Sequence, residues 1–322
     1  MALTTLISGA SGLVGSAIVP ALGREGHRVI RLVRRPPRNN DEIQWDPAAS
    51  VALPADVHLD NVIHLAGENI SGLWTAEKKR RIHSSRVVGT RTLANFLAAR
   101  AQKPAAFICA SAVGYYGSRG DELLTEESAP GTGFLAATCR EWEQAAQPAA
   151  AAGIRTVHLR LGIVLSKKGG ALAPMLLPFR FGLGATMGSG KQWFPWIALA
   201  DLVRVFLLAV NDTSIRGPMN ATSPEPVTNA EFTRALAQAV HRPSWMRIPE
   251  ALVKLAPGGM AEEALLASTR AVPARLQALG FSFEHPGIAG ALRAALNERP
   301  GNERRGNEKS GNASNKNGDG RA

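Results

Sequence analysis

Residues 4–26 of this chain read TTLISGASGLVGSAIVPALGREG. A short apolar run with β-branched residues leads into a turn with three glycines, and apolar residues at helical spacing then continue to Gly26. The next run, HRVIRLV at residues 27–33, has the composition of a second strand. The order strand, glycine turn, helix, strand predicts one βαβ unit of a doubly wound α/β sheet.

The three glycines, Gly9, Gly12 and Gly15, have the spacing of a dinucleotide-binding turn. The first permits a tight turn, the second lets the backbone approach a pyrophosphate, and the third lets the helix pack closely on the strand. The pyrophosphate would then lie on the N–H groups at the start of the helix. The alternative is an ordinary turn between a strand and a helix, because glycine turns are common.

Arg34 and Arg35 directly follow the second predicted strand. A carboxylate here would bind the ribose 2′-hydroxyl of NAD, whereas arginine forms charge-assisted hydrogen bonds to the 2′-phosphate of NADP. We therefore expect NADP(H) to be preferred over NAD(H). The alternative is that the two arginines only solvate the end of the strand.

Strands and helices continue to alternate along the chain. Strands are predicted within residues 57–67, 105–117 and 154–166, and helices within 74–99, 140–152 and 228–240. This alternation predicts an α/β fold with a doubly wound parallel sheet of the Rossmann type. We expect its later loops to build a substrate region, followed by a small, mostly helical C-terminal piece.

The predicted domain boundaries follow from this organisation. Residues 1–242 would form the NAD(P)-binding domain with its interleaved substrate region, and residues 243–296 a small C-terminal domain. Residues 297–322 contain almost no apolar side chains. Such a segment cannot bury enough surface to offset the entropy of ordering it, so we expect a disordered tail.

Composition narrows the possible partners. No apolar run reaches the roughly 18 to 20 residues of a membrane span, and we expect no membrane partner. The formal net charge is +11, but the basic residues are scattered, and we expect no nucleic-acid partner. Cys109 and Cys139 give neither a disulfide framework nor a metal site, which fits a reducing, cytoplasmic setting.

Longer motifs add a family resemblance. They read HLAGENI, KRRIHSSRVVGT, SAVGYYG, LRLGIVLSKKGGALAPMLLPFRFGLG, GSGKQWFPWI, NATSPEPVTNAEF and GGMAEEALLASTRAVPARLQALGF. With the glycine turn, they resemble the extended short-chain dehydrogenase/reductases of the NAD(P)-dependent epimerase/dehydratase group. Within that group, the chain resembles an atypical epimerase-family, cell-division-inhibitor-like branch. The resemblance spans residues 4–282.

The resemblance also implies a set of cofactor contacts. The glycine turn would cradle the cofactor, the two arginines would meet its 2′-phosphate, and the turn after the next strand would pass over the adenosine ribose. We add Arg86 as a replacement for positive charge lost near the nicotinamide ribose. The predicted cofactor-binding residues are Gly9, Ser11, Gly12, Leu13, Val14, Gly15, Arg34, Arg35, Leu65, Ala66, Gly67 and Arg86.

The catalytic set of the superfamily is not kept. Active members use a serine or threonine, a tyrosine and a lysine, helped by an asparagine, because the tyrosine exchanges a hydroxyl proton and the lysine lowers its pKa. The corresponding positions here hold Ala112, Leu135, Cys139 and Arg86. Phe194 stands where an arginine usually grips the pyrophosphate of a sugar nucleotide, which argues against such a substrate.

Other residues remain candidates for chemistry. Tyr115 lies on a loop after a predicted strand and is our candidate proton donor, with packing as the alternative. Ser111 could hydrogen-bond a substrate oxygen or only shape the turn. Predicted substrate contacts are Glu68, Asn69, Lys191, Gln192 and Trp196. The tryptophan belongs to an aromatic group that could equally be core.

Two functions are consistent with these residues. The first is an NADP(H)-binding oxidoreductase or isomerase with a non-standard catalytic set, acting on an unknown small molecule. The second is a non-catalytic NADP(H)-binding sensor or regulator that kept the fold and lost the chemistry. The oligomeric state is not indicated by the sequence.

Overall fold

A computed structural model of the protein describes residues 3–54, 57–255 and 258–298. An eight-stranded sheet runs through its centre, in the order β13-β8-β6-β5-β1-β2-β3-β4. Its strands are β1 (Thr4–Ser8), β2 (Arg28–Val33), β3 (Glu42–Asp46), β4 (Ser50–Val51), β5 (Asn61–His64), β6 (Ala106–Ala112), β8 (Arg155–Leu161) and β13 (Gly217–Ala221). All neighbours are parallel except β3 and β4. The predicted doubly wound Rossmann fold is confirmed.

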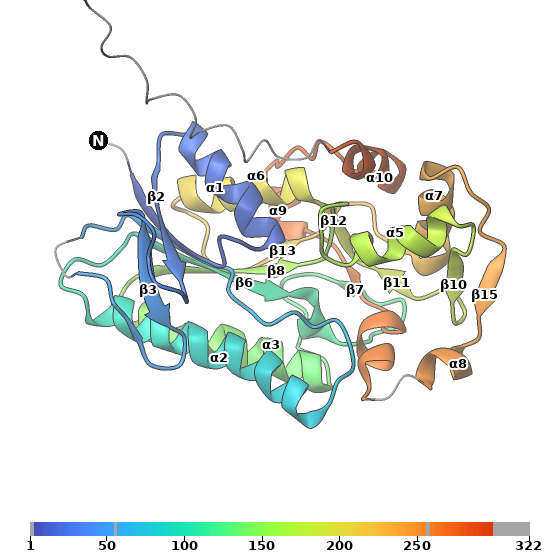
Figure 1. Ribbon diagram of the computed structural model, residues 1–322, viewed down its shortest axis with the longest axis horizontal. Coiled ribbons are helices and arrows are strands. Elements are labelled where there is room, and N and C mark those ends of the chain that lie inside the picture. The colour runs from blue at the N-terminus through green and yellow to red at the C-terminus, as the bar shows by residue number, and fades with distance from the viewer. Residues whose placement is uncertain (1–2, 55–56, 256–257, 299–322) are drawn as a thin grey trace, which may run out of the picture.

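Helices cover both faces of this sheet (Figure 1). Successive side chains of a strand point to opposite faces, so Ile7 of β1 packs with α1 (Leu13–Arg24) and α6 (Leu199–Asn211). Its neighbour Leu6 packs with α2 (Ala76–Ala99) on the other face. Near-continuous apolar strands are what a parallel sheet buried on both faces requires.

Four elements differ from the sequence-based prediction. Helix α3 (Phe134–Ala145) begins six residues before the predicted helix at 140–152, and α4 (Gln147–Ala151) follows it. Gly133, with φ of +102°, turns the chain into α3. Strands β3 and β13 are not among the predicted elements, because EIQWD alternates over only five residues and GPMNA has no clear alternation.

The C-terminal region is tied to the main sheet domain by strands as well as helices. Its strand β15 (Met246–Ile248) pairs with β10 (Ala185–Met187), and β16 (Arg270–Ala271) pairs with β7 (Leu123–Leu124). Its helices are α8 (Glu250–Lys254), the π-helix η2 (Ala261–Leu265), α9 (Ala274–Ala278) and α10 (Ile288–Asn297). Helix α10 packs on α7 (Asn229–Ala239). Of the predicted tail, residues 299–322 lie outside the described residues.

A buried ion pair joins α3 to the end of β8. Arg160 Nε and Nη2 each donate to Glu143, at 2.9 Å, and the Arg160 side chain is only 3% exposed. The remaining Arg160 nitrogen donates to the Tyr116 hydroxyl, which in turn donates to Asn220 on β13. Ser111 at the end of β6 also donates to Glu143, at 2.7 Å. This network fixes α3 relative to three strands of the sheet.

Glu143→Gln should therefore destabilise the protein strongly. Loss of one partner leaves the Arg160 charge buried and uncompensated, which costs about 3–5 kcal/mol of unfolding free energy. Glu141→Gln on the same helix is the matched control, because Glu141 pairs with His83 in a much more exposed position. That control should change the unfolding free energy by less than about 1 kcal/mol. Urea unfolding of both variants measures the difference, and equal losses would contradict a structural role for the buried pair.

Candidate functional site

The candidate site lies where the direction of the sheet connections reverses. The chain leaves β1 for α1 on one face, and leaves β5 for α2 on the other face. A crevice opens at the carboxyl ends of two such neighbouring strands, and this is where doubly wound sheets bind ligands. The turn at residues 9–12 and the loop at residues 65–69 border this point.

The glycine turn is as tight as the sequence requires. Gly9 has φ of +72°, and a Cβ there would lie 2.8 Å from the Leu65 carbonyl carbon. A Cβ on Gly15 would lie 2.3 Å from the Gly9 oxygen, so a side chain at either position would force the backbone apart. Gly12 is the N-cap of α1 and supplies no capping side chain. The first N–H groups of a helix have no intrahelical partner, so this turn fits a pyrophosphate.

The predicted turn residues surround this opening. Ser11 and Gly12 are exposed, while Leu13 and Val14 are half-buried in the first turn of α1. Leu13 also packs against Gly169 and Gly170, so the later loop after β9 (Ile163–Leu165) borders the glycine turn.

The two arginines after β2 have different environments. Arg35 donates to both carboxylate oxygens of Glu42 on β3, at 2.7 and 2.8 Å. These hydrogen bonds, together with the Arg38 N–H, lower the pKa of Glu42 to about 2. Arg34 is exposed and has no side-chain partner among the described residues. The uncompensated positive charge at the end of β2 is therefore that of Arg34.

The loop after β5 is held to β1 by hydrogen bonds. Ser8 Oγ, at the end of β1, accepts from the N–H groups of Leu65 at 3.2 Å and Ala66 at 3.4 Å. Gly67 comes next and is exposed. This arrangement places the three predicted ribose contacts beside the glycine turn.

Arg86 reaches this loop from α2. Its Nη1 donates to the Glu68 carbonyl at 2.9 Å, and its guanidinium lies 3.4 Å from where a Cβ of Gly67 would stand. The guanidinium also lies over the Trp142 ring, at 5.1 Å. Burial lowers the pKa of Arg86, and its hydrogen bonds within the described residues go to carbonyls rather than to a carboxylate. A buried cation without a carboxylate bond favours an anionic ligand nearby.

Two predicted substrate contacts fold back onto their own segment. The Glu68 carboxylate accepts from Lys78 Nζ at 2.7 Å, which lowers the pKa of Glu68. Asn69 Oδ1 accepts from the N–H of Ser71 at 2.9 Å, closing a local turn. Both side chains thus stabilise the loop after β5 and the start of α2.

Small and apolar groups meet where the superfamily places its acid and base. A Cβ on Gly114 would lie 3.5 Å from Leu135 Cβ and 3.7 Å from Cys139 Sγ, so these residues converge beside the end of β6. Burial raises the pKa of the Cys139 thiol to about 12. The thiol is therefore neutral and only weakly acidic near pH 7, and neither it nor Leu135 or Ala112 supplies the activated acid and the positive charge that tyrosine and lysine provide.

The two tyrosines have different environments: the Tyr116 hydroxyl is part of a buried network, whereas the Tyr115 hydroxyl has no partner among the described residues. Tyr116 is fully buried, its hydroxyl lies in the Arg160 network, and burial raises its pKa to about 12. Tyr115 is half-buried, with the Arg160 guanidinium 3.6 Å from its ring centre. Its hydroxyl makes no hydrogen bond to any described residue. Ser111 is 2% exposed and already donates to Glu143.

The later loop is closely joined to the core and to the C-terminal region. Trp196 is 1% exposed and lies in the core, where its indole nitrogen has no hydrogen-bond partner among the described residues, and its contact with substrate stays a prediction. Phe194 stacks on Phe232 at 4.2 Å, which continues this core. Gln192 Nε2 donates to the Met187 and Leu265 carbonyls, and its role is to join the loop to the C-terminal region. Lys191 is exposed.

The C-terminal region contributes a residue that sequence reasoning missed. Glu263 on η2 accepts hydrogen bonds from the N–H groups of Phe134 at 3.0 Å and Leu135 at 2.8 Å. A carboxylate at a helix N-terminus is stabilised by the helix dipole as well as by these bonds. The helix that holds Leu135 and Cys139 is therefore capped by the C-terminal region, and only the acidic pair at 262–263 signals this in the sequence.

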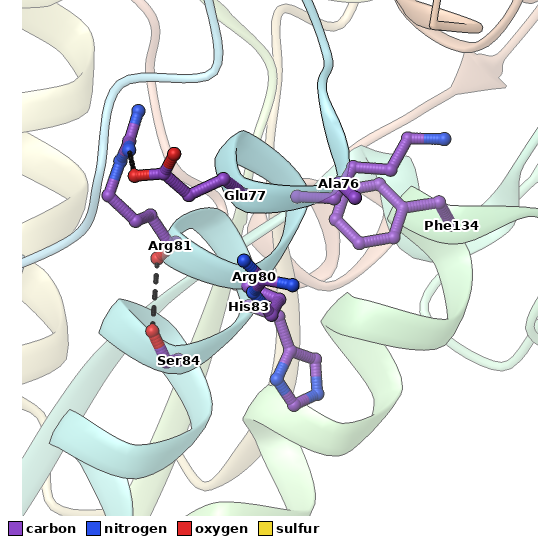
Figure 2. Close-up of a pocket in the computed structure, with 8 residues that line it drawn as sticks. Ala76, Glu77, Arg80, Arg81, His83, Ser84 and Phe134 are labelled. Carbon is purple, nitrogen blue, oxygen red and sulfur yellow. Dashed lines mark hydrogen bonds and ion pairs between the residues drawn. The ribbon is translucent and has the colours of Figure 1, made fainter.

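A surface pocket of about 560 Å³ lies beside the start of α2 and is distinct from the glycine turn (Figure 2). It is lined by Ala76, Glu77, Lys79, Arg80, Arg81, His83, Ser84 and Phe134. Ser85 and Arg86, which contact the loop after β5, do not line it. Among the described residues, no cluster of histidine, cysteine or carboxylate side chains could hold a metal ion. None of the described helices is long and apolar enough to cross a membrane.

A doubly wound sheet whose glycine turn lies where the direction of the connections reverses defines a protein with the dinucleotide-binding (Rossmann) fold. The family model of the NAD dependent epimerase/dehydratase family matches residues 5–220, and a domain of unknown function (DUF1731) matches residues 248–295. The chain belongs to the NAD dependent epimerase/dehydratase family, in its atypical short-chain dehydrogenase/reductase branch.

Similar proteins cover nearly the whole chain. Epimerase family protein Mb2239 of Mycobacterium bovis is 43% identical over 297 residues, which is 92% of this chain and 98% of that protein. Epimerase family protein YfhF of Bacillus subtilis is 36% identical over 91% of this chain and 98% of that protein. The crystal structure of human epimerase family protein SDR39U1 (isoform2) with NADPH has a TM-score of 0.83 at 32% identity, covering 92% of this chain and 100% of that one.

The buried thiols give a direct test of the site chemistry. Cys109 and Cys139 are both buried, and burial raises the pKa of each thiol, so the native protein should contain almost no thiolate at pH 8. Because the thiolate is the reactive form, a disulfide reagent should react slowly with the folded protein and rapidly with both cysteines in guanidinium. A thiol that reacts equally fast in the folded and denatured states would contradict the neutral Cys139.

Proposed function

We propose that the protein binds NADP(H) in the crevice between β1 and β5. The observation that carries this proposal is the cradle formed by Gly9, Gly12 and Gly15, because a Cβ at Gly9 or Gly15 would lie less than 3.0 Å from backbone atoms. The pyrophosphate would lie on the N–H groups at the start of α1, and Leu65 to Gly67 would pass over the adenosine ribose. The family membership supports this assignment, as does the similarity to human SDR39U1, whose crystal structure contains NADPH.

The preference for NADP(H) over NAD(H) rests on Arg34. Its guanidinium is exposed at the end of β2 and free to bind a 2′-phosphate, whereas Arg35 is neutralised by Glu42. A carboxylate in this place would instead bind a 2′-hydroxyl. Arg86 would add positive charge on the nicotinamide side, where the superfamily lysine is replaced by Cys139.

We further propose that the protein is an oxidoreductase or isomerase acting on a small molecule. The nicotinamide would supply or accept a hydride, and a side chain must then exchange a proton with the substrate oxygen. Tyr115 is the candidate, because its hydroxyl is unbonded within the described residues and its ring packs on the fixed Arg160 guanidinium. Exposed Lys191 remains the candidate contact for an anionic or polar group of the substrate.

A second function is favoured by a different observation. Ala112 and Leu135 replace the serine and tyrosine with groups that carry no exchangeable proton, and Cys139 replaces the lysine with a neutral, buried thiol. A protein that binds NADP(H) and reports its level, without turnover, would need the cradle and none of that chemistry. Enzyme and sensor share the same cofactor site and differ only in whether hydride leaves the nicotinamide.

Arg34→Ala should weaken NADPH binding by about one to two orders of magnitude, as expected for the loss of a charge-assisted contact of about 1.5–3 kcal/mol. Arg35→Ala should weaken it less, because Arg35 is already bonded to Glu42. The affinity for NADH should hardly change in either variant, since NADH lacks the 2′-phosphate. Fluorescence titration with both nucleotides measures this, and equal losses for NADPH and NADH would rule out 2′-phosphate recognition.

Tyr115→Phe should abolish turnover and leave NADPH affinity unchanged. Loss of a general acid lowers the rate by about 10²–10⁴-fold. NADPH oxidation is followed with a panel of carbonyl compounds, first with the unaltered protein. Full activity in the phenylalanine variant would exclude Tyr115 as the donor. If NADPH binds and no compound is reduced, the sensor function is the better explanation.

A further inference from the structure

Four large apolar side chains are exposed together at one end of the molecule. They are Leu177, Phe181, Leu183 and Trp245, with exposed fractions of 63%, 73%, 57% and 81%. We refer to these four as the apolar tip. They lie where α5 (Leu172–Arg180) ends and where the chain enters β15, at the end of the molecule that carries β10, β15 and α8 (Figure 1).

The two segments of the apolar tip are in direct contact. Arg242 Nε donates to the Arg180 carbonyl at 2.8 Å, and a Cβ on Gly182 would lie 3.9 Å from Pro243. Strand pairing between β10 and β15 continues this contact on both segments. The segments that carry these exposed side chains therefore lie side by side, and α8 adds exposed Leu252 and Leu255 after β15.

The two segments that form the apolar tip contain arginines and no carboxylate. Residues 144–200 and 232–249, which contain all four of its side chains, include no aspartate or glutamate. They do include Arg180, Arg242 and Arg247, all of them exposed. The next carboxylate along the chain, Glu250, is paired with Lys254 at 2.6 Å.

We propose that the apolar tip docks reversibly onto the surface of an anionic lipid bilayer. Tryptophan, phenylalanine and leucine enter the boundary between headgroups and acyl chains, while neighbouring arginines bind anionic headgroups. This is peripheral docking and requires no spanning helix. The sequence-based expectation of no membrane partner rests on the lack of a long apolar run, whereas the tip combines two segments that are distant in the chain.

Other occupants fit this surface less well. A two-fold contact with a second copy would place the same arginines opposite one another, with no carboxylate in either segment to compensate them. A nucleic acid would match the charge and could stack on Phe181 and Trp245, but it would leave the exposed Leu177 and Leu183 in contact with water. An anionic lipid bilayer fits both features, because its acyl chains match the apolar side chains and its headgroups match the positive charge of the arginines.

The test is co-sedimentation of the full chain with vesicles, either of phosphatidylcholine alone or of phosphatidylcholine mixed with phosphatidylglycerol. We expect binding to the anionic vesicles, little binding to the neutral ones, and weaker binding in high salt because salt screens the arginines. Absence of binding to anionic vesicles in low salt would overturn the proposal.

Variants locate the docking surface. Phe181→Ser combined with Trp245→Ser should lower the partition onto anionic vesicles at least about tenfold, because both rings lose their apolar burial. Leu123→Ser combined with Leu279→Ser is the matched control, since these leucines are 52% and 45% exposed elsewhere. Arg180→Glu combined with Arg242→Glu should abolish binding by charge reversal, which provides a second test that leaves the apolar residues intact.

Two outcomes would contradict this assignment. Equal loss in the leucine control would show that vesicle binding is not located at the apolar tip. A concentration-dependent dimer that the Phe181→Ser, Trp245→Ser variant abolishes, seen by analytical ultracentrifugation, would make a second copy the occupant. NADPH affinity should be unchanged in all these variants, so failure of docking is distinguishable from failure of the cofactor assignment.

Discussion

The site depends on how closely the backbone approaches itself at the end of β1. Gly15 in α1 lies against the Gly9 carbonyl, and Gly9 lies against the backbone of Leu65. These contacts set the distance between the first helix, the first strand and the loop after β5. The exposed N–H groups at the start of α1, the ribose loop beside them and the position of Arg86 behind that loop all follow from this distance.

A second constraint acts on the other side of the crevice. The Arg160–Glu143 pair and the Glu263 cap hold α3 at two points, so its first turns keep a fixed position beside β6. The residues brought there are Leu135, which has no exchangeable proton, and Cys139, whose buried thiol is neutral and only weakly acidic near pH 7. The scaffold for chemistry is thus retained while its usual reactive groups are absent. Any catalysis must therefore use another group, and Tyr115 is positioned by the same arginine.

Much of the fold could be predicted from local pattern. The strand, glycine turn and helix at residues 4–24 agree with the structure, because Leu6 and Ile7 must both be buried and the glycines have a fixed spacing. The pairing of Arg35 with Glu42 could not be predicted, since it depends on β3 lying next to β2. The burial of Trp196 and the cap by Glu263 likewise arise from contacts between distant segments. The apolar tip was missed for the same reason.

The most direct test of the proposed cofactor site is a crystal structure of the protein with NADPH. We expect the 2′-phosphate beside Arg34, the pyrophosphate at the start of α1, and the nicotinamide facing Leu135 and Cys139. Nucleotide bound in the pocket between α2 and α3, with the glycine turn empty, would contradict the proposed site.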